Sequence, residues 1–346
     1  MNRKTPKTVL TVVIGTRNRL AILRRCLEAL IGRIRVCHEI IVADAGSTDG
    51  TLEYLGGLRG IRLVCDGERL GQAKSLNRVV RTVSSRYVCW LSDDNVVREG
   101  ALDEAAGILR RHADIGMVAL KVKDMTGPSS DLPYIGGLAP SGILTCNQGM
   151  LRTGLFHRLG GFDEEFRDYG IDTDLTARVL LAGYKVVVTK QVAVRHYRSH
   201  EDNSWISQEE RQQRLQRGKL LYQQKHAALL AAVDSSRFRA RRELFGSCYS
   251  YKGRKDWQSR FLPQTGRKHR LQYAIFRRLL RVMQGVHGFL RRLRLVPDWG
   301  RVEYCDRDWF NIFCSTFIRT WDLPANFTRP YYLLQEIPAD LRNRLK

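Results

Sequence analysis

Residues 8–44 have the sequence TVLTVVIGTRNRLAILRRCLEALIGRIRVCHEIIVAD. The mainly apolar runs Val9–Ile14 and Ile40–Ala43 have the length of buried strands. Between them, apolar pairs recur at helical spacing while charged residues such as Arg25 fall on the opposite side; the pairs are Ala21-Ile22, Cys26-Leu27 and Leu30-Ile31. This order predicts a strand, a helix and a second strand parallel to the first.

Short apolar runs continue to alternate with helical patterns as far as about Arg195. These runs are Ile61–Cys65, Tyr87–Leu91, Met117–Val122 and Val186–Val188. Continuous apolar strands separated by helices are typical of a mostly parallel sheet that is covered on both faces. The sequence therefore predicts an α/β fold, and in such a fold ligands bind at the carboxyl ends of the strands.

The chain has 346 residues, of which 43% are hydrophobic, and its net charge is +23. This composition excludes a disordered or collagen-like chain, and the excess of positive charge predicts an acidic partner. No stretch approaches the ~18 uninterrupted apolar residues of a membrane-spanning helix, and the first apolar run is too short for a secretory signal. The cysteines form no C-x-x-C pair, which argues against a zinc site and is consistent with a reducing compartment. We therefore expect a cytoplasmic protein.

The chain changes in character after about residue 200, where apolar strands become rare. We predict one domain at residues 1–200 and a basic, mainly helical region at residues 201–346. No acidic residue occurs between Asp256 and Asp298, and an apolar stripe runs through this stretch at helical spacing: Ile275, Leu279, Val282, Met283, Val286, Leu290 and Leu293. A basic amphipathic helix is compatible with lying on an anionic membrane surface. The alternative is a helix that packs on the first domain and keeps a solvated basic face.

The doublet Asp93-Asp94 follows the apolar run Tyr87–Leu91, so both carboxylates should emerge at a strand end. Carboxylates at that position can hold a hard divalent cation and, through it, the phosphates of a substrate. The alternative is the N-cap of a helix that begins in the residues after the doublet. The doublet alone does not decide between these roles.

Other polar residues also follow predicted strands or begin predicted helices. Asp44 lies too early to cap the next helix and is placed to accept hydrogen bonds from a base or a ribose. Asp172 and Asp174 lie at or near a helix start, where the helix dipole alone favours carboxylates. His196 follows the apolar run Val192–Val194, and a neutral imidazole is a good ligand for a divalent ion, although an isolated histidine more often has a structural role.

Taken together and in order, these elements resemble a family 2 glycosyltransferase with a nucleotide-diphospho-sugar-binding fold of the GT-A type. The resemblance covers about Thr8 to Ser199. Its elements are Gly15-Thr16-Arg17-Asn18-Arg19, Asp44 to Gly50, Gly71 to Asn77, Ser92-Asp93-Asp94-Asn95, and Gly161-Phe162-Asp163-Glu164 leading to Asp172-Thr173-Asp174-Leu175. Each element is loose by itself, and their order and spacing carry the assignment.

The resemblance implies that residues 1–200 form a catalytic domain that binds a nucleotide sugar. Asp44 would recognise the nucleotide base, while Asp94, together with Asp93, would engage a Mn²⁺ or Mg²⁺ ion and the diphosphate. Asp172 would be the catalytic base, and His196 would approach the metal or the diphosphate. Further residues near the nucleotide would be Gly15, Thr16, Arg17, Gln72 and Lys74.

The resemblance also implies inverting transfer to an acceptor hydroxyl, with a UDP-sugar as the commonest donor. A basic C-terminal region would suit a peripheral enzyme that acts on a glycan or lipid-linked glycan of the cell envelope at the cytoplasmic leaflet. The sequence departs from the family's pattern at Ala45, where a second Asp is common, and at Ser92, where the metal motif often begins with an acid. It also has Ile171 where a Glu often precedes the base, so more weight falls on Asp172.

Three other classes of protein compete with this interpretation. A basic nucleic-acid-binding protein would explain the charge but not the carboxylates, so nucleic acid is not the expected partner. A nucleotidyltransferase usually needs a basic, glycine-rich triphosphate loop after the first strand, and residues 15–19 are a poor one. A degenerate, inactive scaffold would not need to retain both Asp94 and Asp172.

Overall fold

The computed structural model describes residues 8–126, 133–134, 136–137, 139–197, 206–232, 267–295 and 329–345. Its main feature is an eight-stranded sheet in the order β12-β10-β6-β9-β4-β1-β2-β3. The strands are β1 (Leu10–Thr16), β2 (His38–Asp44), β3 (Ile61–Cys65), β4 (Tyr87–Ser92), β6 (Ile115–Ala119), β9 (Gly149–Arg152), β10 (Lys185–Thr189) and β12 (Tyr331–Gln335). Only β9 and β12 run antiparallel to their neighbours, so the sheet is mostly parallel.

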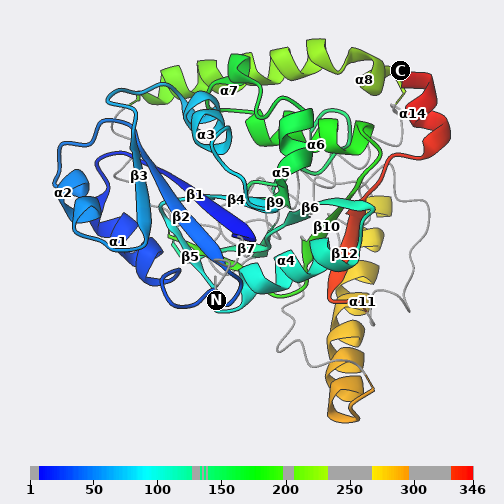
Figure 1. Ribbon diagram of the computed structural model, residues 1–346. Coiled ribbons are helices and arrows are strands. Elements are labelled where there is room, and N and C mark those ends of the chain that lie inside the picture. Colours follow the sequence, from blue (N-terminus) through cyan, green and yellow to red (C-terminus); the bar gives the residue numbers. More distant parts are fainter. Residues whose placement is uncertain are drawn as a thin grey trace.

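Helices cover both faces of this sheet (Figure 1). The helices of the described residues are α1 (Leu20–Glu28), α2 (Thr51–Gly56), α3 (Gln72–Val80), α4 (Ala101–Arg111), α5 (Thr153–Arg158), the 3-10 helix η1 (Glu164–Phe166), α6 (Ile171–Leu181), α7 (Gln208–Lys225), α8 (Ala227–Ala231), α11 (Arg267–Arg292) and α14 (Ala339–Leu345). One buried cluster joins the sheet to α3, α5, α6 and α7, and a second joins it to α1, α2 and α4. The α/β fold predicted from the sequence is therefore confirmed.

The run Met117–Val122, expected as one strand, is divided between two sheets. Its first part belongs to β6, and Val122 begins β7 (Val122–Asp124) in a four-stranded sheet of order β5-β11-β7-β8. The other strands of this small sheet are β5 (Asn95–Val97), β8 (Pro133–Tyr134) and β11 (Val194–His196). In its register, His196 pairs with Asn95 on one side and with Asp124 on the other. The small sheet thus brings His196 beside the residues that follow β4.

The antiparallel strand β9 was not predicted from the sequence. It enters between β4 and β6, and its residue Gly149 packs against Trp90. A Cβ at Gly149 would lie 2.8 Å from the Trp90 ring, so only glycine fits without a shift of the sheet or the ring. Four residues without a clear alternation of apolar and polar side chains give too weak a pattern to predict such a strand.

Elements from the second half of the chain also pack on the sheet. Strand β12 pairs with β10, and Tyr222, Leu229 and Ile337 belong to the buried cluster on the α3 and α6 face. The predicted basic amphipathic helix is present as α11, and its lower part extends away from the sheet in Figure 1. In the described part of the chain, no helix is long and apolar enough to cross a membrane. The division into domains at about residue 200 stays a prediction.

Candidate active site at the strand ends

Asp93 and Asp94 lie directly after β4, and their carboxylates are bound by groups from other segments. Asp93, which is 2% exposed, accepts hydrogen bonds from Thr16 Oγ1 at 2.8 Å and from Arg19 Nη1 at 2.5 Å. Arg19 Nη2 also lies 3.4 Å from Asp94 Oδ2. The alternative role as a helix N-cap is wrong, because strand β5 follows the doublet and α4 begins only at Ala101. The doublet instead ties the ends of β1 and β4 together.

His196 lies between two carboxylates. Its Nε2 is 3.1 Å from Asp94 Oδ2 and its Nδ1 is 2.8 Å from Asp124 Oδ1, which also accepts a hydrogen bond from the Tyr134 hydroxyl at 3.1 Å. Burial lowers the pKa of His196, but the hydrogen bonds to Asp124 and Asp94 outweigh this effect and raise it to about 9. Burial opposes ionisation of Asp94, but His196 and Arg19 together hold its pKa below the usual value. Asp124 and Tyr134 were missed by the sequence interpretation.

Asp94 fits a role in holding a divalent cation, and His196 could join it as a ligand only by giving up the Nε2 proton that it shares with Asp94. Asp94 Oδ1 is buried and has no hydrogen-bond partner among the described residues, so one carboxylate oxygen remains to be satisfied. In the described part of the chain, no three or more His, Cys, Asp or Glu side chains are grouped to hold an ion. A cation here would therefore take its other ligands from a substrate diphosphate and water, which is how Mg²⁺ is commonly bound.

The loop after β2 is organised by Asp44. This fully buried carboxylate accepts hydrogen bonds from the Gly46 and Ser47 amides at 2.9 and 2.8 Å and from the Ser47 hydroxyl at 2.5 Å. As the sequence analysis expected, Asp44 does not cap α2. Its carboxylate is instead bound by residues of its own loop. Its contact with a nucleotide base stays a prediction. Gly46 has φ +79°, and a Cβ there would lie 2.5 Å from the Gly67 carbonyl oxygen, so the turn requires glycine.

Gly15 and Thr16 end β1, and Arg17 begins the loop that follows this strand and joins the loop after β2. Asn18 connects the two, because its amide donates to Ser47 Oγ at 2.8 Å and its side-chain oxygen accepts from the Thr48 amide at 2.7 Å. Arg17 is exposed, whereas the Thr16 side chain is already bound to Asp93. Asn18 is a third residue whose role the sequence interpretation missed.

Gln72 and Lys74 lie in the first turn of α3, and both side chains are exposed. The backbone amide of Gln72 donates to Asp168 Oδ1 at 3.0 Å. Asp168, in the segment between η1 and α6, therefore caps the start of α3. Asp168 also accepts a hydrogen bond from Arg214 of α7 at 3.1 Å. The start of α3 is thereby joined to the segment that leads to Asp172.

Asp172 lies in the first turn of α6, as the sequence predicted. Among the described residues, no side chain forms an ion pair or a hydrogen bond with its carboxylate, and burial raises its pKa to about 6. Its charge also raises the pKa of the buried Cys146 thiol, after the larger effect of burial, so the two side chains are near one another. Gln148, two residues further on, donates to Ser92 Oγ at 3.3 Å. One loop therefore connects Asp172 with the end of β4.

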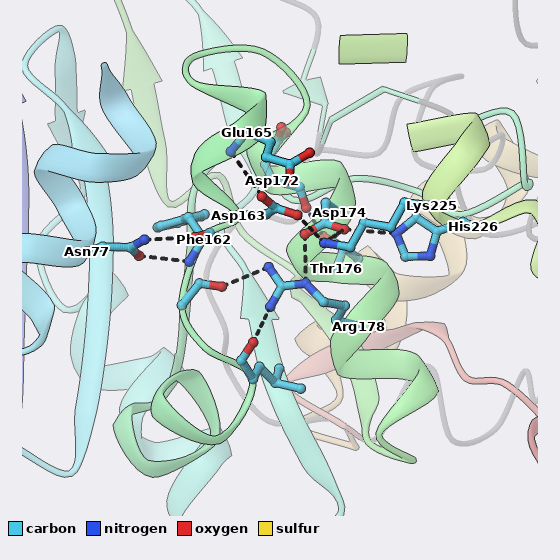
Figure 2. Close-up of polar contacts among 12 residues, drawn as sticks. Asn77, Phe162, Asp163, Glu165, Asp172, Asp174, Thr176, Arg178, Lys225 and His226 are labelled. Atoms are coloured by element: carbon cyan, nitrogen blue, oxygen red, sulfur yellow. Dashed lines mark hydrogen bonds and ion pairs between the residues drawn. The ribbon is translucent and has the colours of Figure 1, made fainter. Parts of the chain in front are cut away.

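Asp174, two residues after Asp172, is the opposite case (Figure 2). It is fully buried and accepts from Arg178 Nε at 2.7 Å, Lys225 Nζ at 2.9 Å and His226 Nε2 at 2.9 Å. Burial raises the pKa of Asp174, but these partners outweigh it and hold the pKa below the usual value. Asp174 is thus a structural anchor that ties α6 to the end of α7.

The segment before α6 is held from both sides. Asn77 of α3 donates to the Phe162 carbonyl at 2.7 Å and accepts from the Phe162 amide at 2.8 Å (Figure 2). Arg178 donates to the carbonyls of Leu159 and Gly161 at 2.6 and 2.7 Å, and Lys225 binds Asp163. The glycine-rich segment that the sequence singled out is therefore a rigid support for the start of α6.

Residues 11–136 match the family model described as Glycosyl transferase family 2. The match begins in β1 and ends after β8, so it includes Asp44, Asp93 and Asp94 but not Asp172 or His196. The similarity to this family therefore lies in the first part of the chain, at residues 11–136.

Curated relatives extend the similarity beyond these residues. The O-antigen biosynthesis protein RfbC of Myxococcus xanthus is 25% identical over 229 residues, which are 57% of this chain and 18% of RfbC. The N-acetylglucosaminyl-diphospho-decaprenol L-rhamnosyltransferase of Mycobacterium tuberculosis is 25% identical over 222 residues, which are 50% of this chain and 72% of that enzyme. Among solved structures, S. aureus TarS in complex with UDP-GlcNAc has a TM-score of 0.48 and 17% identity, covering 58% of this chain and 62% of TarS. The chain spans less than a fifth of RfbC.

Replacement of Asp94 by alanine should weaken Mn²⁺ binding by at least about tenfold, because a carboxylate ligand is lost from a site with few protein ligands. Electron paramagnetic resonance titration of Mn²⁺ in the presence of UDP measures this without any turnover. Asp114→Ala, which removes a 57% exposed carboxylate at the start of β6, is the control and should bind as the wild type does. Equal Mn²⁺ affinity in the Asp94 variant would refute the role.

Replacement of Asp174 by asparagine should lower the free energy of unfolding by about 3–5 kcal/mol, because it leaves the cationic Arg178 and Lys225 without their buried counter-charge. The full loss is expected at neutral pH and shrinks as the pH falls through the folded-state pKa of Asp174, which lies below the unfolded value. Urea denaturation of both proteins measures the difference. Glu210→Gln removes an exposed pair of the same i,i+4 spacing, and a loss as large in that variant would contradict the anchor role.

Proposed function

We propose that this chain is an inverting glycosyltransferase that moves a sugar from a nucleotide-diphospho-sugar to an acceptor hydroxyl, with a UDP-sugar as the favoured donor. One observation carries the proposal: Asp172 has no ionic partner among the described residues, whereas the neighbouring Asp174 and the strand-end Asp93 and Asp94 are all paired. A carboxylate kept without a counter-ion in the first turn of a well-supported helix is suited to accept a proton.

The donor diphosphate would lie beside Asp94 and His196, near the guanidinium of Arg19. A Mn²⁺ or Mg²⁺ ion held by Asp94, with His196 as a second ligand once its Nε2 proton is lost, would supply Lewis-acid stabilisation of the departing nucleotide. Asp93 holds Arg19 in place through the 2.5 Å contact, so a positive charge stays beside the carboxylate that binds the ion. Asp124 fixes the orientation of the His196 ring through Nδ1, which directs Nε2 toward Asp94.

Asp172 would accept the proton of the acceptor hydroxyl as that oxygen attacks the anomeric carbon. Its pKa of about 6 makes it a stronger base than an ordinary aspartate, while it stays ionised at neutral pH. If the attack comes from the face opposite the leaving nucleotide, a single displacement inverts the anomeric centre. The paired contacts of Asp174 and the backbone contacts of Phe162 keep the helix start that carries this base in one position.

For the acceptor, we propose a glycan or lipid-linked glycan of the cell envelope. The match to the family 2 model and the two curated relatives with cell-envelope names support this class. A cavity of about 520 Å³ lies next to the segment before α6 and is lined by residues that include Phe166, Tyr169, Arg214 and Glu165. Aromatic faces and charged hydrogen-bonding groups are suited to a sugar, so this cavity is the proposed acceptor site.

Replacement of Asp172 by asparagine should lower kcat by about 10²–10⁴-fold and leave donor affinity unchanged, because the amide cannot accept the proton. In the wild type, kcat/KM should fall about tenfold per pH unit below pH ~6, because the base becomes protonated, and should be level above that pH. Nucleotide release measured from about pH 4.5 to about pH 8.5 gives the rates and their pH profile. Calorimetric titration with the donor gives its affinity.

Asp114→Asn, which changes an exposed carboxylate outside the site, is the matched control and should keep the wild-type rate and profile. Retained turnover in the Asp172 variant would remove this residue from the mechanism. A wild-type profile without an acid limb would contradict the assignment of its raised pKa.

A further inference from the structure

The helix α11 exposes a continuous apolar stripe. Five large apolar side chains of this helix and one directly after it are between 39% and 63% exposed, and they are Leu271, Ile275, Val282, Val286, Phe289 and Leu293. At 3.6 residues per turn, their spacing places all six within a face about 60° wide. The other exposed large apolar side chains in the described part of the chain lie on α7, in the segment after α1 and, at Leu295, just after α11.

The stripe is bordered by positive charge. Arg278, Arg281 and Arg292 are exposed and lie beside one edge of the apolar face on the same helix. No acidic residue occurs in the sequence between Asp256 and Asp298, so no carboxylate of the helix offsets these charges. The surface of α11 thus has an apolar face bordered by positive charge. An ordinary solvated helix would carry charges of both signs.

This arrangement favours one kind of partner. A nucleic acid would be matched by the arginines but would leave the apolar stripe in water. A protein groove would bury the stripe but would not require uniform positive charge. The surface of an anionic bilayer satisfies both features, because apolar side chains enter the acyl boundary while arginines contact the lipid phosphates.

We propose that α11 lies flat on an anionic lipid surface, with the stripe from Leu271 to Leu293 buried in the bilayer interface. The helix is 26 residues long but too charged to span a membrane, which agrees with surface binding. Its lower part extends away from the sheet in Figure 1, and the side chains of the stripe are exposed. The proposal concerns binding alone; that it brings the enzyme to a lipid-linked acceptor rests on the proposed function.

Flotation of the full-length protein with lipid vesicles tests the proposal without any turnover. One set of vesicles is pure phosphatidylcholine, and the other contains roughly one quarter phosphatidylglycerol. The wild type should bind the anionic vesicles at least about tenfold more tightly, and raised salt should weaken that binding. Equal binding to both sets, or no binding to either, would overturn the proposal.

Variants of the helix separate the two features. The double variant Val282→Ser and Phe289→Ser should weaken binding to anionic vesicles by at least about tenfold, because apolar surface is lost from the interface. Arg278→Gln should weaken it about fivefold. The matched control, Leu215→Ser with Leu220→Ser, removes two exposed apolar side chains from α7 and should bind as the wild type does.

Two other outcomes would overturn the proposal. If α11 mediates self-association, sedimentation without lipid will show dimers that the Val282 and Phe289 changes abolish. If the partner is nucleic acid, binding to a short RNA will depend on Arg278 but not on the stripe, and RNA will outcompete vesicles.

Circular dichroism of each variant checks that a loss of binding is not a loss of folding. Donor binding by the same variants tests the proposed function separately.

Discussion

The ion pair between Arg19 and Asp93 is the interaction on which the arrangement of the site depends. It joins the loop after β1 to the end of β4 at 2.5 Å, with the carboxylate almost completely buried. A buried carboxylate without a partner would cost several kcal/mol, so Arg19 must stay in place, and it then lies beside Asp94 as well. From Asp94 the contacts continue through His196 to Asp124, which connects the main sheet with the small one.

The two aspartates of α6 show how the same residue type serves different purposes. Asp174 is surrounded by Arg178, Lys225 and His226 and holds α6 against α7. Asp172 lacks such partners among the described residues, and burial alone raises its pKa. Because Asp174 holds the start of α6 firmly, the fold can keep Asp172 in surroundings that disfavour its charged form.

Local pattern was enough to predict the parallel strands, the carboxylates at their ends and the position of Asp172 and Asp174 in a helix start. It was not enough for β9, whose four residues pair with strands far away in sequence. The partner of His196 is 72 residues away at Asp124, and that of Asp174 is 52 residues away at His226. Such contacts are decided by tertiary packing, so no spacing rule along the chain reveals them.

The most direct test is a screen of purified protein with UDP-, GDP- and dTDP-sugars, with and without Mn²⁺ or Mg²⁺, read by nucleotide release. The paired strand-end carboxylates predict cation-dependent release of the nucleoside diphosphate from one nucleotide series. Silence across all donors, together with tight, salt-sensitive binding to RNA, would contradict the assignment of these carboxylates to sugar transfer.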